Sequence, residues 1–230
     1  GCEYAQTYGL TETSPFLTFS LPGDRQRRLP PAEQMRLRAR TGRPARGVEV
    51  RVVRPPGAER FADVPADDTT VGEVVARGPT VTPGYWRDAE ATREAFKGGW
   101  FHTGDLATVD ENGFINLVDR LKDVVITGGE TVYSIEVENV LYEHPQVLEA
   151  AAFGVPDDTW GEAVRAAVVL ARKGAAQGEE IVAFCRERLA HYKCPRAVDV
   201  LDALPRTGSG KIDKKALREP FWKGRSRRIN

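Results

Sequence analysis

The stretch Val118-Asp119-Arg120-Leu121-Lys122-Asp123 is a dense cluster of charges between two apolar runs. On its N-terminal side, residues 106–109 and 114–118 have the pattern of two strands, and the Asn112-Gly113 pair between them is a strong hairpin-turn signal. On its C-terminal side, the pattern changes to a mixture of helix and strand periods. We therefore expect a domain boundary at residues 119–122, where the hairpin ends.

Local patterns predict further elements on both sides of this boundary. Asp88 precedes a helix over residues 89–96 as its N-cap, and Ser134 does the same for a helix over 135–142. A third helix is expected over residues 179–190, with one apolar face made of Ile181, Val182, Cys185 and Leu189. The remaining expected elements are a helix over 31–40 and strands over 48–53, 72–77, 147–155 and 164–170, with Pro55-Pro56-Gly57 ending the first strand.

The composition is that of a folded protein with two domains. Hydrophobic residues make up 41% and charged residues 29% of the 230 positions, which is enough apolar material for real cores. The 33 basic residues balance 33 acidic ones, so no global charge favours nucleic acid as a partner. No apolar run has the length of a membrane span. Cys2, Cys185 and Cys194 lack metal-site spacing, and their odd number fits a reducing compartment.

The run Pro205-Arg206-Thr207-Gly208-Ser209-Gly210-Lys211-Ile212-Asp213 is the strongest candidate for a catalytic segment. Its glycines allow close backbone approach to a ligand, and Lys211 adds a compact charge on a flexible stem. Such a cation suits a site where a carboxylate meets a phosphate and negative charge accumulates. The spacing is not that of a P-loop, and a solvated basic turn before a terminal helix stays open as the alternative.

Three further blocks give this run a context. They are Gln6-Thr7-Tyr8-Gly9-Leu10-Thr11-Glu12, the segment from Gly72-Glu73-Val74 through Gly78 to Gly84-Tyr85, and Phe101-His102-Thr103-Gly104-Asp105. With the charge cluster and the Lys211 run, they follow the order found in adenylate-forming enzymes. From Gln6 to Leu217 the chain resembles the AMP-forming acyl-CoA synthetases of that superfamily, and specifically their C-terminal portion.

The resemblance implies an α+β fold in three parts. Residues 1–118 would be the end of a large α/β AMP-binding domain with a β-rich, distorted-barrel subdomain. Residues 119–122 would be a hinge, and residues 123–230 a small, mobile α+β domain that carries the lysine loop. The family's Ser/Thr/Gly-rich phosphate loop and most of its acyl pocket lie upstream of the Tyr8 block, and nothing in this chain matches that loop. We therefore expect a chain that is inactive alone, with the N-terminal part absent or supplied as a separate chain.

The resemblance also assigns roles in the first block. Tyr8 would offer a flat face to adenine, and Gly9 would let the backbone approach the nucleotide. Thr11 would donate a hydroxyl hydrogen bond to the α-phosphate, and Glu12 would supply an oxygen ligand to Mg²⁺. The letters alone allow blander roles, with Tyr8 as a core aromatic and Thr11-Glu12 as a helix-capping pair.

Other residues receive roles in the same way. Asp105 directly follows Thr103-Gly104, which we expect to form a tight turn. It has two acceptor oxygens for a ribose diol, or it stabilises that turn. Arg120 would bind the ribose or a phosphate, or form a salt bridge with Asp119 at a domain edge. Lys122 would be the pivot of the hinge, or an exposed charge. Lys211, Thr11 and Glu12 would be the catalytic residues.

Gly128, Gly129 and Glu130 would face CoA, where two glycines leave room for a narrow pantetheine arm. From the letters alone, an ordinary glycine turn between a strand and a helix is equally open. His102 is expected to be structural, because adenylation of an ionised carboxylate needs no general base.

The implied activity is that of an acid–thiol ligase. It would activate a carboxylic acid with ATP and Mg²⁺ to an acyl adenylate and pass the acyl group to CoA in the cytoplasm. We expect a fatty acid as substrate, within fatty acid metabolism, while aromatic acids and a peripheral membrane location stay open. Two alternatives remain, namely a non-catalytic nucleotide-binding or regulatory remnant and an adenylation domain that serves a carrier protein.

Overall fold

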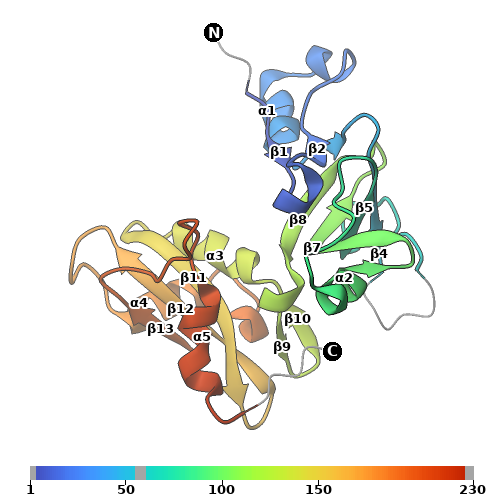
Figure 1. Cartoon of the computed structure of the whole chain (residues 1–230). Helices are drawn as coiled ribbons and strands as arrows, with labels where there is room; N and C mark the ends of the chain where they lie inside the picture. Colours follow the sequence, from blue (N-terminus) through green and yellow to red (C-terminus); the bar gives the residue numbers. More distant parts are fainter. Residues whose placement is uncertain (1–3, 55–60, 226–230) are drawn as a thin grey trace. The chain divides into compact units, whose positions relative to one another are not determined.

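The structure is a computed structural model that describes residues 4–54 and 61–225, so Cys2 and Pro55-Pro56-Gly57 lie outside the described residues. The chain divides into two compact units, Gly1–Leu121 and Lys122–Asn230 (Figure 1). The short helix η3 (Leu121–Asp123) lies at the division. Each unit joins a sheet to short helices, so the α+β class predicted from the sequence is confirmed.

The first unit is built on two antiparallel sheets. The smaller has the strand order β1-β2-β3, and the larger has the order β4-β5-β7-β6 with β8 paired to β7. The strands are β1 (Thr7–Tyr8), β2 (Thr18–Phe19), β3 (Arg43–Pro44), β4 (Glu49–Val53), β5 (Gly72–Arg77), β6 (Phe96–Lys97), β7 (Trp100–Val109) and β8 (Ile115–Arg120). The helices are η1 (Thr11–Thr13), η2 (Gln26–Arg28), α1 (Pro31–Ala39) and α2 (Ala89–Ala95).

Two local signals in this unit act as expected. The Asp88 carboxylate accepts a hydrogen bond of 2.9 Å from the Ala91 amide and caps α2. Between β7 and β8, the Asp110 carboxylate accepts from the amides of Asn112 and Phe114, and Gly113 takes a φ of +76° that favours glycine.

The segment Phe101–Asp105 differs from its prediction. Its Thr-Gly pair was expected to form a tight turn, but the whole segment belongs to the long strand β7. Gly104 adopts a φ of +71° inside the strand, where the pairing with β5 shifts register. The glycine therefore serves a bulge rather than a chain reversal.

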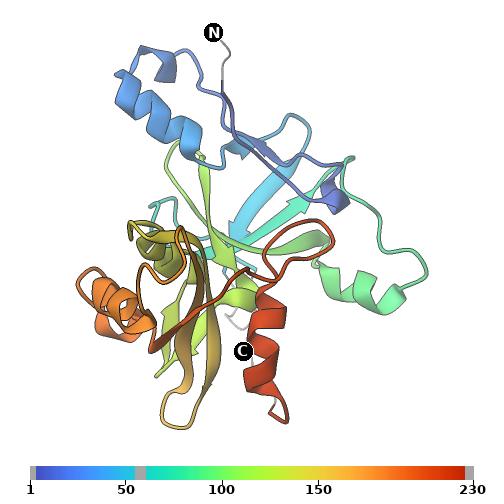
Figure 2. The same cartoon turned by 90° about the vertical axis from the view of Figure 1, so that its left-hand side faces the viewer.

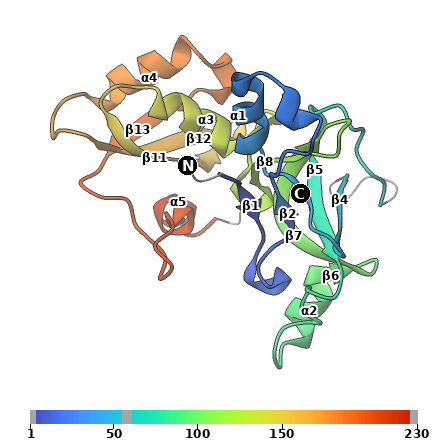
Figure 3. The same cartoon turned by 90° about the horizontal axis from the view of Figure 1, so that it is seen from above.

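The second unit is a five-stranded sheet covered on both faces. Its order is β10-β9-β12-β11, and β13 pairs in parallel with β12. Figures 2 and 3 show α5 on one side of the β11–β12 pair, with α3 and α4 on the other. The elements are β9 (Val125–Thr127), β10 (Glu130–Val132), α3 (Ser134–Tyr142), β11 (Val147–Asp157), β12 (Gly161–Leu170), α4 (Gly178–Arg186), η4 (His191–Lys193), β13 (Ala197–Val200) and α5 (Lys214–Trp222).

The two-sided burial of β11 follows from its side-chain period of two. Ala150 and Ala152 belong to the larger core, which contains residues of α3 and α4. Ala151 and Phe153 point the other way and pack in a second cluster with Leu217 of α5. A strand that is apolar at consecutive positions is therefore stable only between two layers of helices.

Two helix predictions in this unit were wrong in detail. Ser134 is the first residue of α3, and its N-cap is Tyr133; the Ser134 hydroxyl accepts a hydrogen bond of 2.7 Å from Lys214. Helix α4 ends at Arg186 rather than at residue 190, and the amide of Arg188 bonds to the Cys185 carbonyl three residues back, which tightens the turn after the helix. Cys185 itself is fully buried, as the sequence predicted.

We expect Leu141→Ala to lower the free energy of unfolding of the second unit by about 2–5 kcal/mol. Leu141 of α3 is fully buried in the larger core of the second unit. Truncation to alanine leaves a cavity there that the surrounding side chains cannot fill. The matched control is Leu148→Ala on β11, where the side chain is 59% exposed and the expected loss is below about 0.5 kcal/mol. Urea denaturation compares the two variants, and equal losses would contradict this description of the core.

Candidate functional site

Asp105 stands at the centre of a polar cluster in the first unit. One carboxylate oxygen, Oδ2, accepts a hydrogen bond of 2.7 Å from the Tyr8 hydroxyl. The other, Oδ1, lies 3.3 Å from Nε of Arg120, which is the residue opposite Asp105 in the β7–β8 register. The carboxylate is thus held in a fixed orientation from both sides. The side chain of Asp105 is only 9% exposed, whereas that of Arg120 is 46% exposed and reaches solvent.

The position of Tyr8 explains why it donates to Asp105. Its ring is partly buried against apolar residues of the sheet. Burial, followed by the charge of Asp105, raises the pKa of the Tyr8 phenol. The hydroxyl therefore keeps its proton at physiological pH and remains a donor. Tyr8 can thus be a core aromatic residue and a residue of the candidate site at the same time.

The rest of the first block is arranged around η1. A Cβ on Gly9 would lie 1.7 Å from the Pro15 carbonyl oxygen, so glycine is required there for the chain to pack on itself. The hydroxyl that caps η1 belongs to Thr13, which exchanges hydrogen bonds with the Leu10 backbone. Thr11 is exposed, and the Glu12 carboxylate accepts a hydrogen bond of 3.0 Å from the Tyr85 hydroxyl.

Arg120 and Asp119 make different contacts from those first considered. The salt bridge of Arg120 is with Asp105 across the hairpin. The Asp119 carboxylate instead accepts a hydrogen bond of 2.7 Å from the Arg120 amide. The guanidinium therefore belongs to the Asp105 cluster.

Lys211 lies in a short, closed loop of the second unit between β13 and α5. The Thr207 amide donates to the Lys211 carbonyl at 2.8 Å, and the Gly210 amide donates to the Thr207 carbonyl at 2.9 Å. The Arg206 guanidinium adds a bond of 2.8 Å to the Gly210 carbonyl. Hydrogen bonds to backbone carbonyls hold the conformation of the loop. The exposed Lys211 side chain is not needed for that conformation.

Lys122 is tied to the helix that follows this loop. Arg218 of α5 donates to the Lys122 carbonyl at 3.0 Å and to the Asp123 carboxylate at 3.1 Å. The side chains of Arg218 and Asp123 are 15% and 11% exposed, so this is a partly buried ion pair. Lys122, the first residue of the second unit, is therefore bound to α5 through its backbone carbonyl.

Gly128 and Gly129 form the turn of the β9–β10 hairpin. Both have positive φ, +59° and +86°, as a two-residue hairpin turn requires. The two glycines thus form a tight turn, which joins two strands rather than a strand and a helix. A Cβ on Gly128 would lie 2.6 Å from the ring of Trp160, whose carbonyl accepts the Gly128 amide hydrogen bond.

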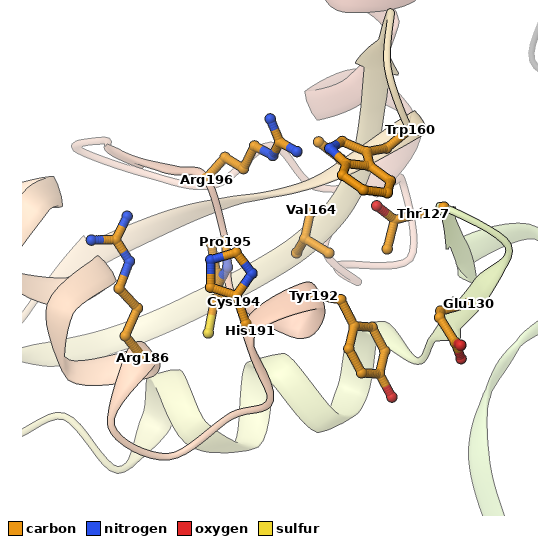
Figure 4. A pocket seen from close by; sticks show the side chains of 12 residues that line it. Thr127, Glu130, Trp160, Val164, Arg186, His191, Tyr192, Cys194, Pro195 and Arg196 are labelled. Atoms are coloured by element: carbon orange, nitrogen blue, oxygen red, sulfur yellow. The ribbon is translucent and has the colours of Figure 1, made fainter.

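This hairpin borders a cavity of about 520 Å³ within the second unit (Figure 4). Thr127, Glu130 and the indole of Trp160 lie on one side of the cavity in Figure 4, and Gly128 also lines it. The other walls bring in the segment around η4 and the side chains of Arg186 and Arg196. The cavity thus combines aromatic faces with guanidinium groups, which suits a ligand with a flat ring and negative charge.

Sequence reasoning missed Trp160 in this cavity. The signal was a tryptophan in a polar turn, Asp157-Asp158-Thr159-Trp160-Gly161, where a core residue is unexpected. The Asp157 carboxylate holds that turn by accepting the amides of Thr159 and Trp160, and the indole stays 50% exposed. Trp160 and Gly128 meet only because β12 pairs with β9 at Gly161 and Thr127.

The predicted residues therefore fall into groups within each unit. In the first, the structure joins Tyr8, Asp105 and Arg120, while Glu12 is held separately by Tyr85. In the second, Gly128 and Glu130 border the cavity. None of the helices in the described part of the chain is long and apolar enough to cross a membrane.

Known proteins resemble both units. Residues 1–86 match the family described as AMP-binding enzyme, and residues 136–211 match the AMP-binding enzyme C-terminal domain. The feruloyl-CoA synthase of an Amycolatopsis species is 44% identical over 221 residues, which cover 96% of this chain and 42% of that protein. A medium/long-chain-fatty-acid–CoA ligase of Mycobacterium tuberculosis is 40% identical over 234 residues, covering 98% of this chain and 38% of that ligase.

Solved structures resemble the chain as well. ATP-bound MatB from Rhodopseudomonas palustris has a TM-score of 0.80 and 35% identity, with 94% of this chain and 40% of that chain covered. The chain thus spans roughly two fifths of the length of the proteins it matches. With both family matches in order and these identities along nearly its whole length, the chain belongs to the adenylate-forming AMP-binding enzymes, the family of its acyl-CoA ligase relatives.

Proposed function

We propose that the protein containing this chain is an acid–thiol ligase that forms an acyl adenylate from ATP and then an acyl-CoA. The observation that carries this proposal is the oriented carboxylate of Asp105, held between Tyr8 and Arg120. A carboxylate can accept about four hydrogen bonds, so these two contacts are compatible with acceptance from a ribose diol. The family of the chain supports the same assignment.

The first unit would bind the nucleotide. Tyr8 would present the remaining face of its ring to adenine, and Gly9 would keep the backbone close to the base. Arg120, half-exposed beside Asp105, is suited to the ribose or a phosphate. The exposed Thr11 hydroxyl would donate to the α-phosphate.

Glu12 would supply only one of the oxygen ligands that the expected Mg²⁺ needs. No group of three or more His, Cys, Asp or Glu side chains suited to a metal occurs in the described ranges. Mg²⁺ however often takes one or two carboxylates together with substrate phosphates and water. Glu12, which already accepts from Tyr85, would supply such an oxygen, and the ion would neutralise phosphate charge when bound.

Lys211 would act in the first half-reaction. An oxygen of the substrate carboxylate attacks the α-phosphorus of ATP, the bond to the pyrophosphate oxygen breaks, and pyrophosphate leaves. Negative charge accumulates on the phosphorus oxygens during this step. The Lys211 ammonium, on a loop with its own backbone frame, would stabilise that charge.

The second half-reaction needs a thiol. The thiol loses its proton to solvent, its sulfur attacks the acyl carbonyl carbon, the bond from that carbon to the phosphate oxygen breaks, and AMP leaves. We propose that the backbone at Lys122 changes conformation between the two half-reactions and that residues 119–122 form the hinge between a domain of residues 1–118 and one of residues 123–230. Gly128, Gly129 and Glu130 would then face CoA, whose nucleotide end suits the aromatic and guanidinium lining of the neighbouring cavity.

We propose that the acid substrate is a fatty acid. We also propose that the protein is located in the cytoplasm. The names of the relatives include both a feruloyl-CoA synthase and a medium/long-chain-fatty-acid–CoA ligase, so an aromatic acid is the competing substrate. A non-catalytic nucleotide-binding protein and an adenylation domain serving a carrier protein are the competing functions.

The full-length protein should exchange pyrophosphate into ATP only when an acid is present and should form an acyl-CoA. A panel of fatty and aromatic acids, read by pyrophosphate exchange and by mass spectrometry of the thioester, tests this. We expect no exchange from the isolated 230-residue chain. Nucleotide binding without pyrophosphate exchange in the presence of any tested acid would favour the non-catalytic nucleotide-binding protein. Transfer of the acyl group to a carrier protein but not to CoA would favour the adenylation domain that serves a carrier protein.

A further inference from the structure

Glu73 is a buried carboxylate on β5 that faces the irregular part of β7. Its side chain is only 4% exposed. Burying a charged group is costly unless hydrogen bonds compensate it. The compensation comes from β7, at the point where the β5–β7 pairing shifts register.

The register shift is a bulge that ends at Asp105. Glu73 pairs with Leu106, and Val75 pairs with His102. Val74 on β5 therefore lies opposite three residues of β7, namely Thr103, Gly104 and Asp105. Bulges of this kind re-aim the side chains that follow them.

Both oxygens of Glu73 hold this bulge. Oε1 accepts a hydrogen bond of 3.2 Å from the Gly104 amide, and Oε2 lies 2.8 Å from Nδ1 of His102. With its proton on Nδ1, the imidazole donates to the carboxylate. In the described part of the chain, Nε2 of His102 is buried and makes no hydrogen bond, so Glu73 is the polar anchor of the ring.

The bulge also needs an unusual backbone. Gly104 has a φ of +71°, and the Thr103 hydroxyl donates to the Val74 carbonyl at 2.8 Å while accepting from the Asp105 amide at 3.1 Å. The Glu73 carboxylate thus fixes the Thr103–Gly104 peptide, and the Thr103 hydroxyl fixes the Gly104–Asp105 peptide that follows it. A small rotation there would move the Asp105 carboxylate relative to Tyr8 and Arg120.

We infer that Glu73, braced by His102, is a positioning residue that aims Asp105 at the ribose. This inference rests on the proposed ribose role of Asp105 and adds to it the two residues that set its direction. Neither Glu73 nor His102 would touch the nucleotide. Both act through the Gly104 amide and the bulge.

The test measures discrimination between ATP and 2′,3′-dideoxy-ATP by isothermal titration calorimetry of the full-length protein. Hydrogen bonds from the diol to a charged carboxylate should make ATP bind about 10- to 100-fold more tightly than the dideoxy analogue. Asp105→Ala should bring this ratio close to one. Glu73→Leu should lower the ratio at least several-fold while the affinity for dideoxy-ATP changes little.

Conservative variants separate positioning from general damage. Glu73→Gln keeps an oxygen for the Gly104 amide and can donate to Nδ1 once the imidazole proton moves to Nε2, so it should retain most of the ratio. The matched control is Glu49→Leu on the neighbouring strand β4, where an exposed pair with Arg77 is lost and the ratio should stay unchanged. If Glu73→Leu does not fold, His102→Phe, which keeps a ring beside Phe61, should lower the ratio instead.

Each outcome decides the inference. A Glu73→Leu or His102→Phe protein that loses both nucleotides equally, or that keeps the full ratio, would overturn it. An unchanged ratio in Asp105→Ala would instead remove the ribose role itself, and the positioning role with it. A lowered ratio in both Asp105→Ala and Glu73→Leu, with Glu73→Gln close to wild type, would support it.

Discussion

Lys211→Ala is expected to slow acyl-adenylate formation by about 10²–10³-fold, the usual effect of removing one preorganised electrostatic contact. Transfer of the acyl group from preformed acyl adenylate to a thiol should stay close to the wild-type rate. The reason is that the ammonium stabilises charge on phosphorus only while that phosphorus is under attack. The measurement is single-turnover kinetics of each half-reaction in the full-length protein.

Lys211→Ala should remove the ammonium group without changing the conformation of its loop. The Thr207 and Gly210 amides and the Arg206 guanidinium hold it through backbone carbonyls, so alanine leaves its frame intact. Lys215→Ala, the same change at an exposed position in α5, is the matched control and should leave both half-reactions near wild type. Equal losses of both half-reactions in Lys211→Ala would give the lysine a structural role instead.

Signals confined to a few neighbouring residues were predicted well. Asp88 caps α2, and the turn before β8 forms at Asn112-Gly113 with a positive φ at the glycine, because both signals act on backbone groups close to them in the chain. The α+β class followed from the order of the motifs and the family resemblance that it carries, and the apolar runs of β5 and β11 also indicated strands, because such runs are local.

Features that depend on distant residues were not predicted. Thr103 and Gly104 look like turn residues, and only the pairing of β7 with β5 makes them a bulge. Ser134 was expected to cap a helix, but its hydroxyl meets Lys214, eighty positions along the chain. Helix α4 was extended too far because Leu189 continues the apolar face, and the tightened turn in which Arg188 bonds to the Cys185 carbonyl has no signal in the sequence.

The candidate site divides in the same way. Motif order identified Tyr8, Asp105, Arg120 and Lys211 as candidates. It did not indicate that Tyr8 and Arg120 both bind the Asp105 carboxylate, because β1, β7 and β8 come together only in the folded unit. The roles of Glu73 and Trp160 were missed for the same reason, since Glu73 binds the Gly104 amide of another strand and Trp160 packs on Gly128 in the β9–β10 turn.

Lys122→Pro is expected to have the opposite effect to Lys211→Ala. Proline fixes φ near −65°, a value that suits the short helical turn η3, and it keeps the carbonyl that Arg218 binds. Acyl adenylate should therefore still form. A second backbone conformation that proline opposes by about 3 kcal/mol would be populated about 100-fold less, and transfer to CoA should slow by a similar factor.

Lys122→Ala separates the backbone from the side chain in this experiment. Alanine removes the ammonium but leaves φ free, so thiol transfer should be affected far less than in Lys122→Pro. Single-turnover kinetics of both half-reactions, with thermal unfolding to verify that each variant is folded, gives the comparison. Normal thiol transfer in a folded Lys122→Pro protein would remove the hinge assignment. A loss of equal size in Lys122→Ala would move the role from the backbone to the side chain. Slow transfer in the proline variant alone would mean that this one peptide changes conformation between the two half-reactions.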